Sequence, residues 1–320
     1  MIPLSRDFLI VSLLGLFSFY INFYYGHLGV SPMDNFVLYN GGYRILKGYT
    51  PFNDYWLVTG PFLDYLNAIF FSIFGLNWKS YIIHSSIFNT IIALSTYFIL
   101  LNFNLSKLWS LFYSILFSVL MYPVVGTPFV DHHSTIFLIL SFYLFIFSVN
   151  KDNTITLFFI PFLFTISFMC KQTPATYGVI GAFFLIILYA FLNKEIAKKI
   201  IVTSIFGSIF AIIFLLIFFY FTGIKIELFF QQYILFAKTI GGGRLGDFNF
   251  NILNFSLDYK FINIYILCLI FIIFKIPYKT TANKKLLISL ISIITLAFVM
   301  LLHQSITLNQ NFVFFSDPVA

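Results

Sequence analysis

Long apolar runs with no charged residue between their ends are the feature that most constrains the fold of this chain. Of its 320 residues, 60% are hydrophobic and 9% are charged, whereas soluble domains have roughly 25% charged residues. About 20 apolar residues are enough to cross a bilayer as a helix, and lipid leaves the backbone no alternative to internal hydrogen bonds. The sequence therefore predicts an all-α fold, a polytopic transmembrane bundle of about nine spans. These lie at residues 8–25, 81–101, 108–124, 134–149, 154–170, 174–192, 200–222, 261–274 and 286–302.

The lysines indicate how the spans are oriented. Residues 8–25 follow Arg6 and lead into no small-residue cleavage site, which is typical of an uncleaved signal anchor. Loops rich in Lys and Arg stay in the cytosol, so segment 61–76 is predicted to lie along the outer interface without crossing. The inner loops then carry Lys107, Lys151, Lys194, Lys198, Lys199, Lys275, Lys279, Lys284 and Lys285. We expect a multi-pass protein of the inner (plasma) membrane whose net charge of +7 meets anionic membrane lipids and not nucleic acid.

The same topology gathers the carboxylates on the extracytoplasmic face. Ion-coupled carriers place ionisable residues near the bilayer midplane, and no predicted span has an Asp, Glu, Lys or Arg between its ends. This distribution argues against ion-coupled transport and favours chemistry at the level of the headgroups. The outer acids are Asp34, Asp54, Asp64, Asp131, Glu227, Asp247, Asp258 and Asp317, and the inner acids are Asp7, Asp152 and Glu195.

The first long polar segment, 30–75, mixes charges with tyrosines and a tryptophan, which is typical of a surface at the headgroups. Asp34 either caps a predicted helix at 36–46 or is a base that accepts a proton from an acceptor hydroxyl. Arg44 and Lys47 either form the solvated end of that helix or bind a lipid phosphate. Asp54, in the following turn, is a further candidate substrate contact.

Further candidates lie at the outer ends of later spans. Asp131 either caps the fourth span or faces Asp34 as a second active-site carboxylate, which is the preferred interpretation. His132 and His133 are candidate substrate contacts. They are weak metal ligands, because adjacent residues of a helix cannot both face one ion. Lys171 either reaches up to the headgroups or contacts a phosphate.

Arg244 lies in the glycine-rich run 241–247, within the second long outer loop, 223–260. The run lacks the Lys-Ser/Thr ending of a phosphate-binding loop and a preceding strand, so nucleotide binding is a poor interpretation. It is either a flexible linker or a mobile lid that brings Arg244 to an anionic substrate.

Four polar or thiol side chains within or beside spans are given packing roles. His84 and Asn89 are predicted to be hydrogen-bonded packing groups. Cys170 and Cys268 have neither a disulfide framework nor a metal-ligand spacing and are predicted to pack as small apolar residues.

A series of motifs follows the predicted signal-anchor span. The early Asp34 comes first, and a later Asp131 stands at the fourth span. Between them come Arg-Ile-Leu-Lys-Gly at 44–48, Tyr-Thr-Pro-Phe-Asn-Asp-Tyr at 49–55 and Gly-Pro-Phe-Leu-Asp-Tyr-Leu at 60–66. This pattern resembles the GT-C superfamily of membrane glycosyltransferases, and in particular its family 39-type branch, which includes protein O-mannosyltransferases and the aminoarabinose transferase of lipid A. The resemblance covers residues 8–192.

The resemblance implies glycan biosynthesis in the cell envelope. A sugar would pass from a polyprenyl-phosphate donor to a lipid, glycan or protein acceptor on the extracytoplasmic face, with inversion at the anomeric carbon. Asp34 would be the base and Asp131 its partner. Cations would stabilise the departing phosphate, the candidates being Arg44, Lys47, Lys171 and Arg244. Many members of this family have a second acid beside or near the first, whereas Asn35 follows Asp34 here. Dependence on a divalent cation therefore stays an open alternative.

Two other functions stay open. A lipid-linked saccharide flippase or carrier predicts a polar path through the spans, and a non-catalytic subunit of a polysaccharide assembly complex tolerates the loss of both aspartates. The predicted organisation is one GT-C-like transmembrane domain over residues 1–320. Its active-site loop is 26–80, and its second long outer loop is 223–260.

Overall fold

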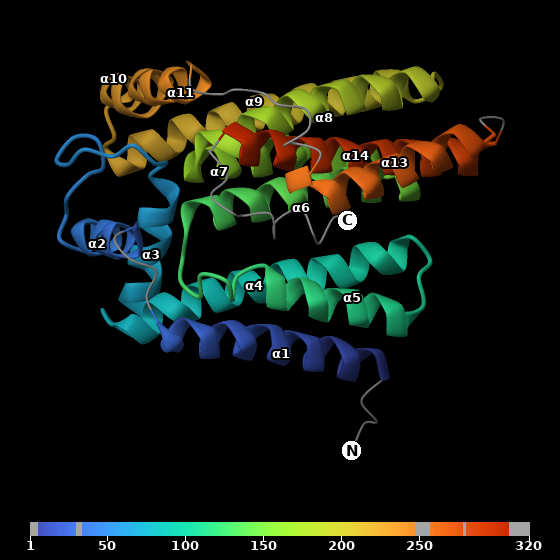
Figure 1. The fold of residues 1–320 in the computed structure, drawn as a ribbon. Helices are drawn as coiled ribbons and strands as arrows, with labels where there is room; N and C mark the ends of the chain where they lie inside the picture. The colour runs from blue at the N-terminus through green and yellow to red at the C-terminus, as the bar shows by residue number, and fades with distance from the viewer. Residues whose placement is uncertain (1–5, 30–33, 247–256, 278–279, 307–320) are drawn as a thin grey trace.

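The computed structural model describes residues 6–29, 34–246, 257–277 and 280–306. Within them the regular structure is helical, apart from an isolated β-bridge between Pro51 and Tyr55. Figure 1 shows the long helices stacked side by side, from α1 (Arg6–Leu28) at one edge, through α6 (Val130–Lys151), to α9 (Ala197–Thr222) at the other. The predicted all-helical fold class is confirmed for these residues.

Six of the nine predicted spans correspond to helices that are long and apolar enough to cross a membrane. These are α1, α4 (Trp78–Asn102), α6, α8 (Gln172–Leu192), α9 and α14 (Thr281–Ile306). The other three predicted spans form shorter helices: α5 (Lys107–Leu120), the 3-10 turn η1 (Thr154–Phe158) followed by α7 (Ile160–Cys170), and α13 (Lys260–Lys275). Length and composition thus support a membrane protein with six candidate spans, and the count of nine stays a prediction.

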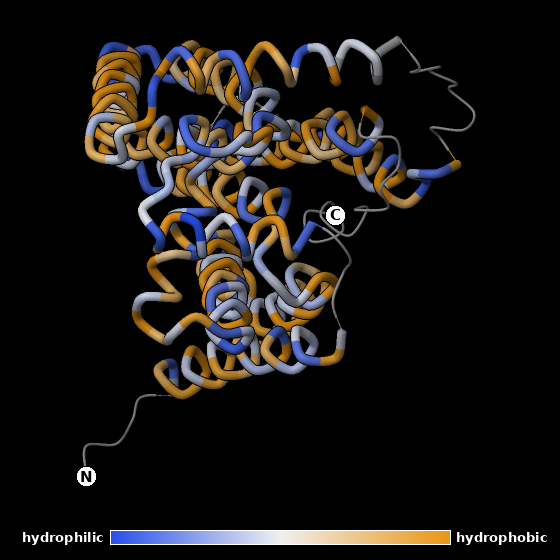
Figure 2. The backbone as a smooth tube through the Cα atoms, turned by 90° about the vertical axis from the view of Figure 1, so that its left-hand side faces the viewer, coloured by the Kyte–Doolittle hydropathy of each residue, from blue (hydrophilic) through white to orange (hydrophobic). Residues whose placement is uncertain are grey.

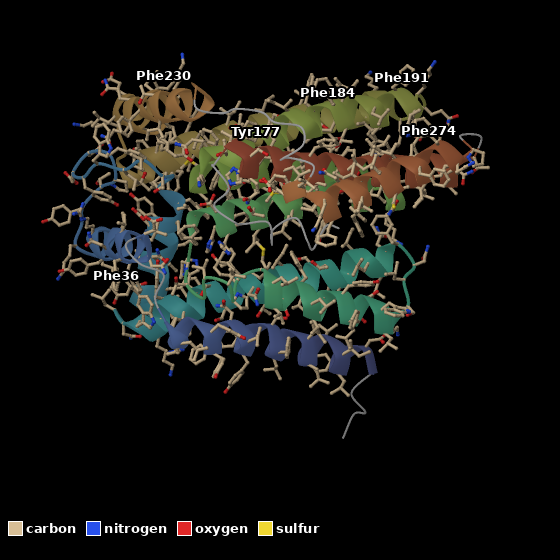
Figure 3. The ribbon with its side chains drawn as sticks, viewed as in Figure 1. Phe36, Tyr177, Phe184, Phe191, Phe230 and Phe274 are labelled. Carbon is tan, nitrogen blue, oxygen red and sulfur yellow. The ribbon has the colours of Figure 1, made fainter. Side chains whose placement is uncertain are left out.

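The outer helices of the stack expose apolar side chains, as lipid-facing helices do, and hydrophobic residues run along the long helices in Figure 2. The most apolar window of α6 is 78% buried, whereas those of α1 and α9 are only 17% buried. Phe184 and Phe191 on α8 and Phe274 on α13 project away from the stack in Figure 3. Apolar surface of this extent is unusual on a soluble monomer and marks contact with a partner or with lipid.

The core of the stack is built around α6, which packs against α4, α7, α8 and α14. Close helix approach depends on small residues: a Cβ added at Gly178 of α8 would lie 2.1 Å from Leu138 Cδ1 of α6. Polar side chains join helices as well. The Asn89 amide donates to the backbone oxygens of Ser18 (2.8 Å) and Ser118 (3.0 Å). Asn89 is therefore the hydrogen-bonded packing group that the sequence predicted.

One end of the bundle carries short connections with lysines in or directly beside them. The turns at 103–106, 152–153 and 193–196 lie at this end, away from α2 (Asp34–Leu46) and α3 (Phe62–Phe74) (Figure 1). Lys107 is paired with Asp7, and Lys285 Nζ lies 2.5 Å from Asp152 Oδ2.

The opposite end carries α2, α3, the single turn α10 (Ile226–Phe229), the π-helical segment η2 (Phe230–Leu235) and α11 (Phe236–Gly246) (Figure 1). Segment 61–76 forms a helix, as predicted, and at 13 residues α3 is shorter than the six candidate spans. The linker interpretation of the glycine run is wrong for residues 241–246, because α11 continues through them. Asp247, Lys279 and Asp317 lie outside the described residues.

Candidate active site

Helices α2 and α3 pack closely because two consecutive glycines of α2 face α3. A Cβ added at Gly41 would lie 2.2 Å from Asp64 Oδ1, and one at Gly42 would lie 2.6 Å from Asn67 Cβ. The Asn67 amide also donates to the backbone oxygen of Leu38 (3.1 Å). Together these contacts fix how α2 lies on α3 at the end of the bundle.

Gly41→Ala is expected to lower the midpoint of thermal unfolding in detergent, because overpacking of this kind costs about 1–3 kcal/mol. The matched control is Gly242→Ala in α11, where an added Cβ has nothing within 4 Å. Alanine has the higher helix propensity by about 1 kcal/mol, so the control raises the midpoint or leaves it unchanged. Equal shifts in both variants would contradict the close approach of α2 and α3.

Asp64 of α3 is buried beneath α2 and bonded to the loop between the two helices. Its side chain is 1% exposed, and the Tyr55 hydroxyl donates to its Oδ2 (2.8 Å). The Arg44 guanidinium lies 4.8 Å from the centre of the Tyr55 ring. Burial raises the pKa of the Asp64 carboxyl to about 7. The Tyr55 hydrogen bond and the Arg44 charge lower this pKa and offset part of the effect of burial. One buried carboxyl thus joins α2, the loop and α3.

The raised pKa of Asp64 predicts a pH-dependent stability. Between its ordinary pKa of 3.8 and the folded value of about 7, the folded protein holds a proton that the unfolded chain has lost. The contribution of Asp64 to stability is therefore greatest below about pH 4 and falls as the pH rises to 7. The variant Asp64→Asn keeps a hydrogen-bond acceptor for Tyr55 but has no titrating carboxyl. Its thermal midpoint in detergent should therefore not show the decrease between pH 5 and 7 that we expect of the wild type. Parallel curves for the variant and the wild type would contradict the assignment.

Asp131 is buried in the first turn of α6, where it holds two other elements. Its Oδ1 lies 2.5 Å from Lys171 Nζ, between α7 and α8, and 3.1 Å from His303 Nε2, near the end of α14. The N-cap of α6 is Phe129, so the capping interpretation of Asp131 is not supported. The Lys171 side chain is 19% exposed and is paired with Asp131. The predicted alternative, in which it extends to the lipid headgroups, is therefore not supported.

Asp34 is exposed at the start of α2, and its chain segment lies beside that of Asp131. The Tyr81 hydroxyl of α4 lies 3.1 Å from two backbone oxygens, those of Asn35 and Pro128. The residue after Asp34 and the residue three before Asp131 therefore meet at one hydroxyl. Within the described residues Asp131 is bonded to Lys171 and His303, and no shared hydrogen-bond partner connects its carboxylate with that of Asp34.

The side-chain amide of Asn35 is a buried polar group beside Asp34. Both its oxygen and its nitrogen are buried without a hydrogen-bond partner among the described residues. Such a group costs about 1–3 kcal/mol when it is left unsatisfied. Asn35 therefore has spare capacity to bind a polar ligand next to the exposed carboxylate.

His133 belongs to a chain of hydrogen bonds inside the bundle. Its Nε2 lies 3.0 Å from His84 Nε2, and His84 Nδ1 lies 2.7 Å from Asn67 Oδ1, while the Tyr122 hydroxyl contacts His133 Nδ1. If the Tyr122 hydroxyl donates, His133 carries its proton on Nε2 and His84 on Nδ1, so every bond is satisfied by two neutral rings. The packing role predicted for His84 is confirmed.

His132 is fully buried as well, with its ring centre 4.9 Å from that of Tyr122. Neither His132 nor His133 has any accessible surface in this conformation. The structure therefore gives the two rings buried positions among other side chains, and their contact with a substrate stays a prediction.

The remaining predicted site residues lie around the loop between α2 and α3. Lys47 is exposed, with its Nζ 5.6 Å from the centre of the Tyr43 ring. Asp54 is exposed and accepts the backbone N–H of Thr50 (2.6 Å), which stabilises the turn. Arg244 lies on α11, and its side chain lies outside the description.

This loop is fastened to the second outer segment by two side-chain amides. Asn53 donates to the Gly223 oxygen (2.8 Å) and accepts from the Lys225 N–H (3.1 Å). Gln232 of η2 accepts from the Leu57 N–H (3.0 Å) and donates to the Phe52 oxygen (2.8 Å). The two segments predicted as outer loops thus form one assembled surface.

The comparisons with known proteins leave this arrangement without a named counterpart. No protein-family model matches the chain, and neither a curated protein nor a solved structure matches it. In the part of the chain that the structure describes, no three His, Cys, Asp or Glu side chains are grouped to hold a metal ion. The function is therefore argued from the geometry of this end of the bundle.

Three residues of this end were not assigned a role from the sequence. Asp64 stood in the quoted Gly-Pro-Phe-Leu-Asp-Tyr-Leu motif, and its position on a short apolar helix was the available signal. Tyr55 stood in the neighbouring motif. His303, near the end of the last span, gave no local signal, because its partner Asp131 is 172 residues away in the sequence.

Proposed function

We propose that the chain is an integral membrane glycosyltransferase. It transfers a sugar from a polyprenyl-phosphate donor to a lipid, glycan or protein acceptor on the extracytoplasmic face. The observation that carries the proposal is the exposed carboxylate of Asp34, which stands beside the buried amide of Asn35. The segment of Asp34 also meets that of Asp131, the partner of Lys171. An accessible acid next to a held cation suits displacement of a phosphate from a sugar.

In the proposed reaction, Asp34 accepts the proton of the acceptor hydroxyl. The acceptor oxygen forms a bond to the anomeric carbon as the bond from that carbon to the phosphate oxygen breaks. Attack opposite the leaving group inverts the anomeric carbon, and polyprenyl phosphate leaves with the bonding electrons. Asn35, whose side-chain donor and acceptor have no partner among the described residues, is buried directly beside Asp34 and would hold a hydroxyl that enters there.

Lys171 is the proposed cation for the departing phosphate. Arg44 lies ten residues from Asp34 along α2, about 15 Å at the helical rise, which is longer than one sugar ring. Lys171 is held by Asp131, whose segment meets that of Asp34 at Tyr81. Asp131 is then a positioning residue that keeps the ammonium group oriented, and Arg44 and Lys47 are left for more distant parts of donor or acceptor.

The test is incubation of the purified protein with labelled polyprenyl-phosphate sugars and candidate acceptors. Released polyprenyl phosphate is separated from the donor and counted, with heat-denatured protein as the blank. Release that requires both acceptor and folded protein supports the proposal. Movement of intact donor across a vesicle membrane without release would favour the carrier and count against it.

A further inference from the structure

A pocket of about 580 Å³ opens at the lysine-rich end of the bundle, away from α2 and α3. It lies among three segments: the turn after α6, the turn between α8 and α9, and the first turn of α14. Its charged lining residues are Asp152, Lys194, Glu195, Lys199 and Lys284. The proposed sugar transfer makes no use of this pocket.

The acidic members of the lining do not balance the basic ones. Asp152 is paired with Lys285, with 2.5 Å between Oδ2 and Nζ. Lys284 Nζ donates to the backbone oxygen of Leu192 (3.3 Å), a neutral acceptor that leaves the positive charge uncompensated. The charge of Asp152 is thus already satisfied by a lysine outside the lining.

Three lysines therefore face a single further acid, Glu195. Helix α9 also begins in the wall of the pocket, with no acidic residue in its first turn and no side chain capping its amides. A helix N-terminus carries partial positive charge, which adds to that of the lysines. The pocket is consequently electropositive and suited to an anion.

The size and surroundings of the pocket favour a lipid over a free anion. Its volume lies within the range of about 300–1,000 Å³ that is typical of small-molecule sites. Phe191 lines the pocket, is 69% exposed and projects outward from α8 in Figure 3. A charged cavity that opens beside an outward-facing apolar side chain matches a molecule with a polar head and an apolar tail.

We propose that this pocket binds the phosphate-bearing headgroup of an anionic membrane lipid. Lys194, Lys199 and Lys284 contact the phosphate oxygens, and the acyl chains lie along α8 past Phe191. Basic pockets between membrane helices are a known means of selecting anionic headgroups. The site is independent of Asp34, so its failure and that of the sugar-transfer proposal are distinguishable.

The test titrates the purified protein in uncharged detergent with short-chain phosphatidylglycerol, phosphatidylcholine or inorganic phosphate, and follows the thermal midpoint. The pocket variant is Lys194→Ala/Lys199→Ala. The matched control, Lys151→Ala/Lys198→Ala, removes the same charge from exposed positions that do not line the pocket. Glu195→Gln removes the opposing acid and serves as a gain-of-affinity variant.

Phosphatidylglycerol is expected to raise the midpoint of the wild type and of the control double variant at similar concentrations. The pocket variant should need about 25-fold more lipid, at about fivefold for each lysine, and Glu195→Gln should need several-fold less. Equal weakening in the pocket and control variants, or an equal response to phosphatidylcholine, would overturn the proposal. Saturation by inorganic phosphate at the same concentration would overturn the lipid as ligand. If the pocket variant does not fold, the Glu195→Gln variant decides the question: an affinity for phosphatidylglycerol equal to that of the wild type would overturn the proposal.

Discussion

Asp34→Asn is expected to lose sugar transfer by at least about 100-fold, the lower end of what a general base contributes. The amide has nearly the same shape as the carboxylate but cannot accept the proton of the acceptor hydroxyl. Asp34 is exposed, and substitutions at such positions usually change stability by no more than about 0.5 kcal/mol. The loss should therefore appear as lower polyprenyl phosphate release per folded molecule, with unchanged abundance in the membrane.

The matched control for this variant is Asp258→Asn, which removes an exposed acid that precedes α13 and lies outside the candidate site. It should retain the activity of the wild type. If Asp34→Asn also retains activity in an assay where the wild type is active, Asp34 is not the base and the proposed reaction is wrong.

Asp131→Ala is expected to destabilise the protein by about 3–5 kcal/mol, the effect of removing one partner from a buried ion pair. The substitution leaves the ammonium group of Lys171 and the ring of His303 without their shared carboxylate. We expect a large fall in the thermal midpoint in detergent. The double variant Asp131→Leu/Lys171→Leu should recover much of the loss, because apolar side chains can replace a buried pair at little cost.

An exposed ion pair provides the comparison. Asp152→Ala breaks the pair with Lys285, whose side chains are 60% and 21% exposed respectively. Pairs with this much solvent contribute about 0–1 kcal/mol, so the midpoint should barely move. If the two alanine variants behave alike, or if the double leucine variant is as unstable as Asp131→Ala, Asp131 does not hold a buried cation.

The helices of this fold could be predicted because the signal for each is local. An apolar run reports its own need for lipid and internal hydrogen bonds. Segment 61–76 was interpreted as an interfacial helix because of the distribution of the lysines. The glycine run at 241–246 was misjudged because glycine has low helix propensity, whereas α11 continues through it.

The candidate site was predicted less completely, because its contacts join distant parts of the sequence. Asp34 and Asp131 were identified by type and position, but no local pattern pairs Asp131 with Lys171, 40 residues later. Nor could the sequence show that Asp64 lies beneath Gly41, since that depends on how α2 and α3 cross. Burial and pairing are properties of the assembled end of the bundle.

The account depends on the α2–α3 end of the bundle being presented away from the cytosol. The direct test is single-cysteine labelling of intact cells with a membrane-impermeant maleimide, after Cys268, the exposed native cysteine, is replaced by serine. Lys47→Cys and Lys198→Cys are matched probes, since both lysines are exposed and lie at opposite ends of the bundle. We predict labelling of position 47 in intact cells and of position 198 only after permeabilisation. The reverse pattern would contradict the account.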